Sequence, residues 1–160
     1  MMPTSVSGRV AIFFGVMALA LTLVLPAAAA DTATGKAQKG SAADSESKDP
    51  NYWFQKGALC ATYGNNPAAI RYFSKTIALN PGHSGAHFSR GVAYGQMGNY
   101  ARAVADLNRA IEMEPQNGLY YYGRGRTYLL AGEKDTAMQD LRKAAGLGDE
   151  DAQAYLKDLK

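Results

Sequence analysis

The sequence predicts an all-α protein, an α-solenoid of three helix hairpins followed by a short capping helix. Two observations lead to this prediction. From Pro50 onward the chain repeats itself at an interval of 34 residues, and a regular period of this length is typical of stacked helical units. Within each unit, apolar residues recur three and four positions apart in two segments, which is the spacing of one face of a helix.

Several kinds of residue follow this interval. The series are Gly57, Gly91 and Gly125; Gly64, Gly98 and Gly132; Ala69, Ala103 and Ala137; and Phe73, Leu107 and Leu141. Glycine and proline interrupt the apolar spacing between the segments. We therefore expect helices near residues 50–63, 67–79, 84–97, 100–113, 118–131 and 134–146, which give repeats at 50–83, 84–117 and 118–148. Asp49 and Asn117 are suitable N-caps for the first helices of the first and third units.

The segment 149–160 predicts a final helix with a polar outer face. Its inward residues would be Ala152, Tyr155, Leu156 and Leu159. The last unit of a solenoid exposes an apolar face unless a polar-backed element covers it. We interpret this segment as a C-terminal capping helix.

The units resemble tetratricopeptide repeats, whose pattern over 34 residues is W-x2-L-G-x2-Y, then A-x3-F, then P. The matching residues are Trp53, Gly57, Ala69, Phe73 and Pro81 in the first unit, His87, Gly91, Tyr94, Ala103, Leu107 and Pro115 in the second, and Tyr121, Gly125, Tyr128, Ala137 and Leu141 in the third. The departures are Lys56, Arg90 and Arg124 for the leucine, Cys60 for a tyrosine, and Asp149 for a third proline. The resemblance covers residues 50–148.

This resemblance implies a reason for glycines inside helices, where each costs roughly 1 kcal/mol relative to alanine. Gly57, Gly91 and Gly125 would lie where the two helices of a hairpin press together, opposite the alanine series. The glycines of the Gly64 series would end the first helix of each hairpin. Gly95 belongs to neither series and is expected on an open face.

Residues 1–30 have the features of a signal peptide for export. Arg9 is the only charge, residues 10–25 are apolar, and Ala28-Ala29-Ala30 provides an A-x-A cleavage site. Cleavage before Asp31 would leave the protein in the periplasm or secreted, whereas an uncleaved segment 10–30 would anchor it in the inner membrane. Residues 31–49 contain no large apolar side chain, and this composition predicts a disordered linker.

Charge and cysteine content narrow the functional classes. Loss of Arg9 would reduce 17 basic residues to 16, against 14 acidic ones. A surplus this small, without a basic cluster, argues against a nucleic-acid partner. Cys60 is the single cysteine, so it has no internal disulfide partner and is expected to be a buried thiol. We expect no cofactor, and no membrane contact unless the signal is uncleaved.

Two motifs are suggestive of catalysis or metal binding but lack the required context. The segment GHSGA, residues 82–86, resembles G-x-S-x-G, yet no strand precedes Ser84 and the final glycine is missing. We interpret it as a helix start. His83 and His87 are four residues apart, but the chain has no third histidine, and structural zinc takes four ligands. We therefore expect neither a catalytic site nor a metal site.

Arg90 and Arg124 replace an expected leucine, which raises the possibility of a ligand site. Each is followed 16 residues later by an aspartate, Asp106 or Asp140. The first unit lacks both partners and pairs Lys56 with Tyr72 instead. Because the arginine and the aspartate are present together or absent together, we interpret them as structural pairs across the hairpins. Exposed pairs of this kind contribute on the order of 0.2–1 kcal/mol to stability.

The resemblance also implies that the first helices of the hairpins line a concave groove that binds extended peptides or partner helices. The groove residues we expect are Phe54, Ala58, Thr62, Phe88, Val92, Gln96, Tyr122, Arg126 and Leu130. Two interpretations of the rings among them stay open: they line the groove, or they pack one hairpin on the next.

The expected function is a non-enzymatic protein–protein interaction module, an adaptor or assembly factor of the bacterial cell envelope. Its partner would be another protein or peptide, whose identity the sequence leaves open. The alternative is a structural protein that associates with copies of itself. The sequence does not decide the oligomeric state.

Overall fold

The computed structural model describes residues 47–159, and these form helices and turns without a strand. The helices are α2 (Pro50–Thr62), α3 (Asn66–Leu79), α4 (Ser84–Gln96), α5 (Tyr100–Met113), α6 (Gly118–Leu130), α7 (Lys134–Gly146) and α8 (Glu150–Asp158). The predicted signal peptide and residues 31–46 of the predicted linker lie outside the described residues. Every predicted helix of the repeats is present, with ends that differ from the expected ones by at most one residue.

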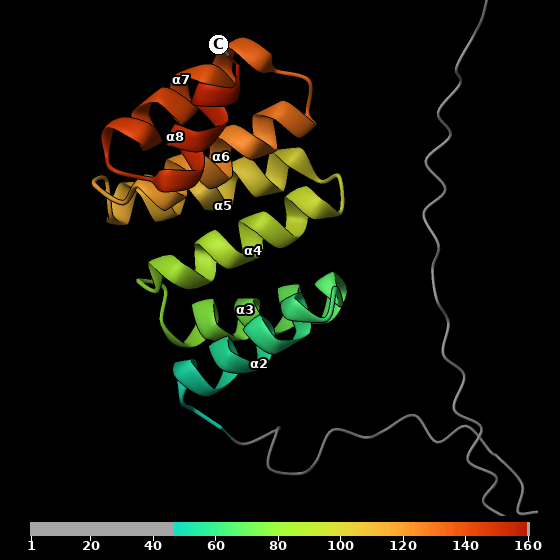
Figure 1. Cartoon of the computed structure of the whole chain (residues 1–160). Helices are drawn as coiled ribbons and strands as arrows, with labels where there is room; N and C mark the ends of the chain where they lie inside the picture. The colour runs from blue at the N-terminus through green and yellow to red at the C-terminus, as the bar shows by residue number, and fades with distance from the viewer. Residues whose placement is uncertain (1–46, 160) are drawn as a thin grey trace, which may run out of the picture. The chain divides into compact units, whose positions relative to one another are not determined.

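The helices pair as three hairpins, α2–α3, α4–α5 and α6–α7, and α8 packs on the last one (Figure 1). Each hairpin also contacts the next, because α3 packs against α4 and α5 packs against α6. Figure 1 shows α2 at one end of this stack and α7 with α8 at the other. The predicted all-α solenoid with a C-terminal helix is confirmed.

The glycine series in the helices marks the contact within each hairpin. A Cβ added at Gly91 would lie 2.9 Å from the Leu107 Cγ and 3.0 Å from the Ala103 carbonyl oxygen. At Gly125 the corresponding distances are 3.1 Å to Leu141 and 3.2 Å to the Ala137 carbonyl oxygen. Since a backbone oxygen cannot move aside as a side chain can, only glycine allows the two helices to approach this closely.

The second series ends the first helix of each hairpin as predicted. Gly64, Gly98 and Gly132 have φ values of 73°, 76° and 85°. This is the left-handed region in which glycine pays no steric penalty. The chain can therefore reverse within a few residues and start the second helix.

Gly95 is the exception to the expectations for glycine, because the predicted open face is wrong. Gly95 is buried, and a Cβ there would lie 3.3 Å from the Thr127 Oγ1 of α6 and 3.7 Å from the Ala103 Cβ. The residue sits where α4 meets the following hairpin. A large side chain at Gly95 would therefore disturb the contact between hairpins.

Side-chain caps begin several helices. Asp49 accepts a hydrogen bond from the Asn51 N–H at 2.9 Å, which confirms the predicted cap of α2. Asn117 occupies the predicted N-cap position of α6, but its side chain makes no hydrogen bond to that helix. Its Nδ2 instead donates to the Glu114 carboxylate at 3.0 Å, since that acceptor lies within reach at the end of α5.

The C-terminal helix covers the last hairpin. Ala152 is fully buried, and Tyr155 and Leu156 pack against the cluster formed by Leu141, Ala144 and Ala152. Leu159 was also expected to point inward, but it is 58% exposed. It follows the last helical residue of α8, so it lies beyond the turn that packs on α7.

Two expectations about the first hairpin need correction. Cys60 is half-buried rather than buried, as are Tyr94 and Tyr128 at the equivalent positions of the other repeats. Residues 47–49 were predicted to belong to the linker, yet they pack on α2: the buried Trp53 donates from its indole Nε1 to the Ser47 carbonyl at 2.8 Å. An indole N–H that is removed from water needs such an acceptor.

Candidate functional site

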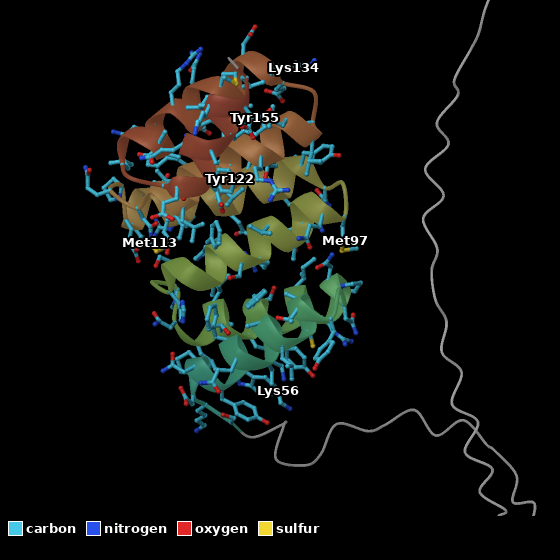
Figure 2. All side chains as sticks on the ribbon, viewed as in Figure 1. Lys56, Met97, Met113, Tyr122, Lys134 and Tyr155 are labelled. Atoms are coloured by element: carbon cyan, nitrogen blue, oxygen red, sulfur yellow. The ribbon has the colours of Figure 1, made fainter. Side chains whose placement is uncertain are left out.

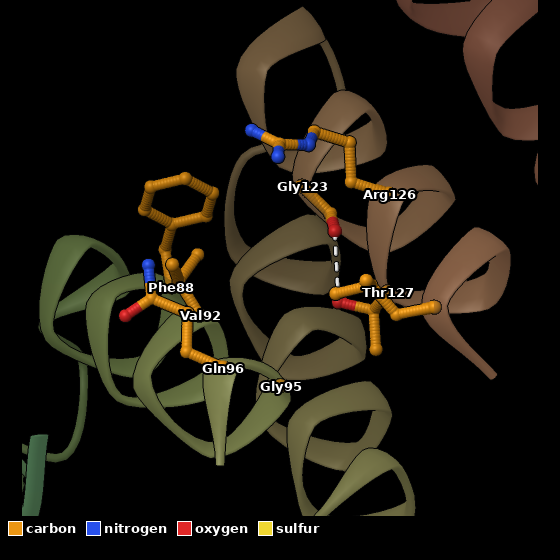
Figure 3. Close-up of a pocket in the computed structure, with 8 residues that line it drawn as sticks. Phe88, Val92, Gly95, Gln96, Gly123, Arg126 and Thr127 are labelled. Atoms are coloured by element: carbon orange, nitrogen blue, oxygen red, sulfur yellow. Dashed lines mark hydrogen bonds between the residues drawn. The ribbon is translucent and has the colours of Figure 1, made fainter. Parts of the chain in front are cut away.

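A cavity of about 170 Å³ lies between α4 and α6 (Figure 3). The residues that line it are Phe88, Val92, Gly95, Gln96, Gly123, Arg126, Thr127 and Leu130. Five of them, Phe88, Val92, Gln96, Arg126 and Leu130, are among the predicted groove residues. The structure thus brings the three second-repeat members of the predicted set together with Arg126 and Leu130 of the third repeat in one hollow, and Tyr122 does not line it.

Two glycines leave the space that forms this cavity. Gly95 and Gly123 supply bare backbone, where the preceding repeat has Ala61 and Ser89 at the equivalent positions. A Cβ at Gly123 would come within 2.7 Å of the Phe88 ring, so the ring lies directly against the α6 backbone. The Thr127 hydroxyl is satisfied within its own helix, since it donates to the Gly123 carbonyl at 2.9 Å. The wall between the two helices is therefore largely apolar.

Sequence reasoning missed Gly95, Gly123 and Thr127 as lining residues. The available signal was that both glycines lie inside helices yet outside the two repeating glycine series. Glycine in a helix interior usually marks a close approach of another group. Which group approaches, and that a hollow remains beside it, depends on how two hairpins dock.

One cation stands at the rim of the cavity. Arg126 is exposed, and its guanidinium carbon lies 5.8 Å from the centroid of the Tyr122 ring. Figure 3 shows the Arg126 side chain and the Phe88 ring extending from α6 and α4 into the same space. An apolar floor with a single guanidinium can hold an apolar side chain and, beside it, a carboxylate.

The predicted aromatic residues each contact the next element along the stack. The Phe54 ring lies 4.7 Å from the His83 ring, and the Phe88 ring stacks on Tyr120 at 5.0 Å. Tyr122 packs against the apolar cluster of α7 and α8. All three rings therefore take part in packing, and Phe88 lines the cavity as well. Ala58 and Thr62 are exposed on α2 and are not part of this cavity.

The two arginines that replace leucine form structural pairs, as predicted. Arg90 donates from Nε and Nη2 to the Asp106 carboxylate at 2.7 and 2.8 Å. Arg124 makes the same two bonds to Asp140, both at 2.7 Å. The hydrogen bond to the aspartate is the main cause that raises the pKa of each guanidinium.

These pairs are not the exposed kind that we expected, because Asp106 and Asp140 are each only 7% exposed. Each arginine also reaches the preceding hairpin. Arg90 Nη1 donates to the Ser74 hydroxyl at 3.0 Å, and Arg124 Nη1 donates to the Asn108 side chain at 2.6 Å. One guanidinium thus joins two helices of its own repeat to the repeat before it.

The first hairpin replaces this ion pair with a contact between a cation and aromatic rings. The Lys56 ammonium lies 5.8 Å from the centroid of the Tyr72 ring. Lys56 and Tyr72 occupy the positions of the arginine and the aspartate in the later repeats. The pairing inferred from the sequence is therefore seen in all three repeats.

The residues that suggested catalysis or a metal have structural partners. His83 caps α4, because its Nδ1 accepts from the Ala86 N–H at 3.1 Å. His87 is buried with its two ring nitrogens 3.2 Å from the Asp106 carboxylate and 3.3 Å from the Pro81 carbonyl oxygen. Ser84 begins α4 and donates to the Glu114 carboxylate.

Neither a metal-binding cluster nor a membrane-spanning helix is found in residues 47–159. Within this range, no group of three or more histidine, cysteine or acidic residues is placed to hold a metal ion. None of the described helices combines the length and the apolar character needed to cross a bilayer.

Comparison with known proteins identifies the repeat. Residues 90–155 match the family model of the tetratricopeptide repeat, and a search of curated proteins found no match. This match identifies residues 90–155 as tetratricopeptide repeats, and the 34-residue period extends the same hairpin unit back to Pro50.

Solved structures share the fold. The first such domain of Spaghetti (RPAP3), bound to the HSP90 peptide SRMEEVD, has a TM-score of 0.64 and 21% identity over 71% of this chain and 91% of its own. YrrB, whose structure is described as having an unusual peptide-binding site, has a TM-score of 0.66 and 19% identity over 72% of this chain and 60% of its own. The domain of OM64 from Arabidopsis has a TM-score of 0.64 and 20% identity over 69% of this chain and 93% of its own.

Proposed function

We propose that this protein is a non-enzymatic interaction module that binds a segment of another protein across α4 and α6. The observation that carries the proposal is the apolar cavity between these helices, with Gly95 and Gly123 in its wall and Arg126 at its rim. The cavity has room for a single large apolar side chain of the partner. Neighbours with this fold include two domains whose structures are described by their peptide binding or peptide site.

The chemistry of the cavity specifies the partner segment. Apolar anchors that fill a preformed hollow supply most of the affinity in such contacts. Arg126 favours a carboxylate next to the anchor, because a guanidinium binds a carboxylate through paired hydrogen bonds. The segment that we propose therefore carries one large apolar residue with an acidic residue beside it.

A peptide library tests this proposal without knowledge of the natural partner. Twelve-residue random peptides displayed on phage are selected on residues 31–160, and the affinities of enriched peptides are measured by calorimetry. We expect enrichment of one apolar residue with an adjacent acid, and a loss of binding of at least tenfold in Val92→Phe, which fills the cavity.

The matched control is Ala58→Phe. Ala58 is exposed and occupies the same repeat position as Val92, but it does not line the cavity. Binding should survive Ala58→Phe and weaken in Arg126→Glu. If the parent chain and Val92→Phe bind the peptides equally well, the cavity is not the binding site.

We further propose that the module works in the bacterial cell envelope, as an adaptor or assembly factor. The support is the pattern of residues 1–30, with an apolar run followed by an A-x-A site. Expression in a bacterium, fractionation and N-terminal sequencing test it. We expect soluble periplasmic protein that begins at Asp31, and a full-length chain in the membrane fraction would instead support the anchored alternative.

A further inference from the structure

The first hairpin exposes Leu59 at a position that the later hairpins bury. On α2, Tyr52, Lys56, Leu59 and Tyr63 follow one another at helical spacing and share one side of the helix. Leu59 is 59% exposed and Tyr63 is 81% exposed. One repeat later, Ala93 at the position of Leu59 is only 2% exposed. Two repeats later, Thr127 at the same position is only 4% exposed.

The later residues are buried because each hairpin packs on the one before it. Arg90 and Arg124, at the position of Lys56, reach Ser74 and Asn108 of the preceding hairpin. Thr127 likewise packs against Gly95 of α4. No hairpin precedes α2 in the described residues. The side of α2 that is equivalent to the hairpin-contacting side of α4 and α6 therefore faces outward.

We call this surface the N-terminal face and define it by six residues. They are Tyr52, Lys56, Leu59 and Tyr63 of α2 with Tyr72 and Lys75 of α3. Figure 2 shows Lys56 at the α2 end of the stack, whereas Tyr155 lies at the opposite end. The two ends differ, because α8 covers the last hairpin with a helix that has a polar outer side.

Aromatic rings support two ammonium groups on this face. The Lys75 Nζ lies 3.8 Å from the centroid of the Trp53 ring, and Trp53 stacks on Tyr72 at 5.8 Å. The Lys56 Nζ lies 5.0 Å from the centroid of the Tyr52 ring. Cations held over rings in this way are attracted by the ring quadrupole and stay at the protein surface.

The charge along the chain is strongly asymmetric, although the net charge is small. Residues 50–105 contain no aspartate or glutamate, and their basic residues are Lys56, Arg71, Lys75, Arg90 and Arg102. From residue 106 onward, acidic residues outnumber basic ones. The N-terminal face therefore combines exposed apolar side chains with positive charge.

We propose that the N-terminal face binds an amphipathic helix of a partner protein that carries carboxylates along its apolar stripe. The partner is a helix because helices α3 and α5 pack on the equivalent positions within this chain. It is acidic because the exposed Lys75 and the neighbouring Lys56 place positive charge on this face. Two copies that met face to face would bring these lysines together, which opposes self-association.

The test uses a yeast-displayed library of 18-residue helices, with leucine fixed on one stripe and the flanking positions mixed between glutamate and alanine. A second library has lysine in place of glutamate. Both libraries are sorted for binding to labelled residues 31–160. The affinities of the selected helices are then measured by fluorescence anisotropy at low and high salt. We expect enrichment from the acidic library only, and affinities that fall at high salt.

Two variants assign the binding to the N-terminal face. Leu59→Asp and Lys75→Glu change exposed residues, and each should weaken the selected helices at least tenfold. Leu130→Asp is the matched control, because Leu130 is equally exposed but lines the cavity between α4 and α6. It should leave these helices bound while it weakens the peptides of the proposed function, so the two proposals fail separately.

Three results would overturn the proposal. Equal enrichment from the two libraries would exclude an acidic helix as the ligand. A dimer in sedimentation experiments that Leu59→Asp abolishes would assign the face to a second copy. A gain in affinity of tenfold or more on removal of residues 31–46 would assign it to the chain's own segment, which contains Asp44 and Glu46.

Discussion

Gly91 and Gly146 are both helical glycines, but their surroundings are opposite. At Gly91 an added Cβ would meet Leu107 and the Ala103 carbonyl at about 3 Å, whereas at Gly146 it would meet nothing within 4 Å. Alanine at Gly91 must therefore push the helices of a hairpin apart. At Gly146 it only restricts the unfolded chain and improves helix propensity.

We accordingly predict stability changes of opposite sign. Gly91→Ala should destabilise the protein by about 1–3 kcal/mol, as overpacking of a core does. Gly146→Ala should stabilise it by roughly 0.4–1 kcal/mol. Urea denaturation followed by circular dichroism measures both changes. A Gly91→Ala variant as stable as the parent would contradict the close approach of α4 and α5.

The Arg124–Asp140 pair gives a second prediction at the level of single residues. Arg124→Met should cost on the order of 3 kcal/mol, because it leaves the carboxylate of Asp140 buried without its cation. The double variant Arg124→Met with Asp140→Leu should recover much of this loss, since no buried charge remains. Denaturation of the two variants and of the parent gives the free energies.

The exposed pair Arg109–Glu112, one helical turn apart, provides the control. Arg109→Met should change the stability by less than about 0.5 kcal/mol. If the double variant loses as much as Arg124→Met does, the bonds of Arg124 to Asn108 would account for the effect rather than the buried charge.

Among the elements, α8 has the clearest task. Ala152, Tyr155 and Leu156 cover the apolar side of the last hairpin. Truncation after Gly148 should expose Leu141 and Ala144, lower the melting temperature and cause association that increases with concentration. Light scattering and thermal denaturation measure this. Leu159→Ser, at an exposed position of the same segment, should leave both properties unchanged, and a soluble, monomeric truncated chain would contradict the capping role.

Helix positions could be predicted because the signals for them are local. Gly64, Gly98 and Gly132 end helices through their own backbone conformation, and the apolar spacing marks the helices between them. The cavity could be predicted only in part, because it depends on the contact between two hairpins. The outward direction of Val92 and Arg126 follows from helix geometry, whereas the roles of Gly95 and Gly123 require the docked structure. Whether the cavity binds a partner stays a prediction.

Across the whole stack, a polar chain links the second hairpin to the third. Ser84 at the start of α4 donates to Glu114, and Tyr120 of α6 donates to the Ser84 hydroxyl at 3.2 Å. The hydrogen bond from Ser84, followed by that from Asn117, lowers the pKa of the Glu114 carboxyl below its ordinary value of 4.5. Burial raises the pKa of the Tyr120 phenol.

The lowered pKa predicts how stability depends on pH. Folding favours the ionised carboxylate of Glu114, so its contribution is present above the ordinary pKa and is lost as the pH falls through the lowered folded value. Glu114→Gln should therefore lose less stability than the parent between about pH 5 and pH 3. Urea midpoints across this range provide the measurement. Parallel pH profiles for the two proteins would show that Glu114 makes no such contribution.

The position of Phe88 has a consequence for motion. The ring contacts Tyr120 and the Gly123 backbone of the next hairpin and also lines the cavity. A bound side chain in the cavity would touch α4 and α6 at once, so these hairpins could separate only after the ligand leaves. Saturating peptide is therefore expected to slow amide hydrogen exchange in α4 and α6. Exchange in α2 and α3 should keep its unliganded rate.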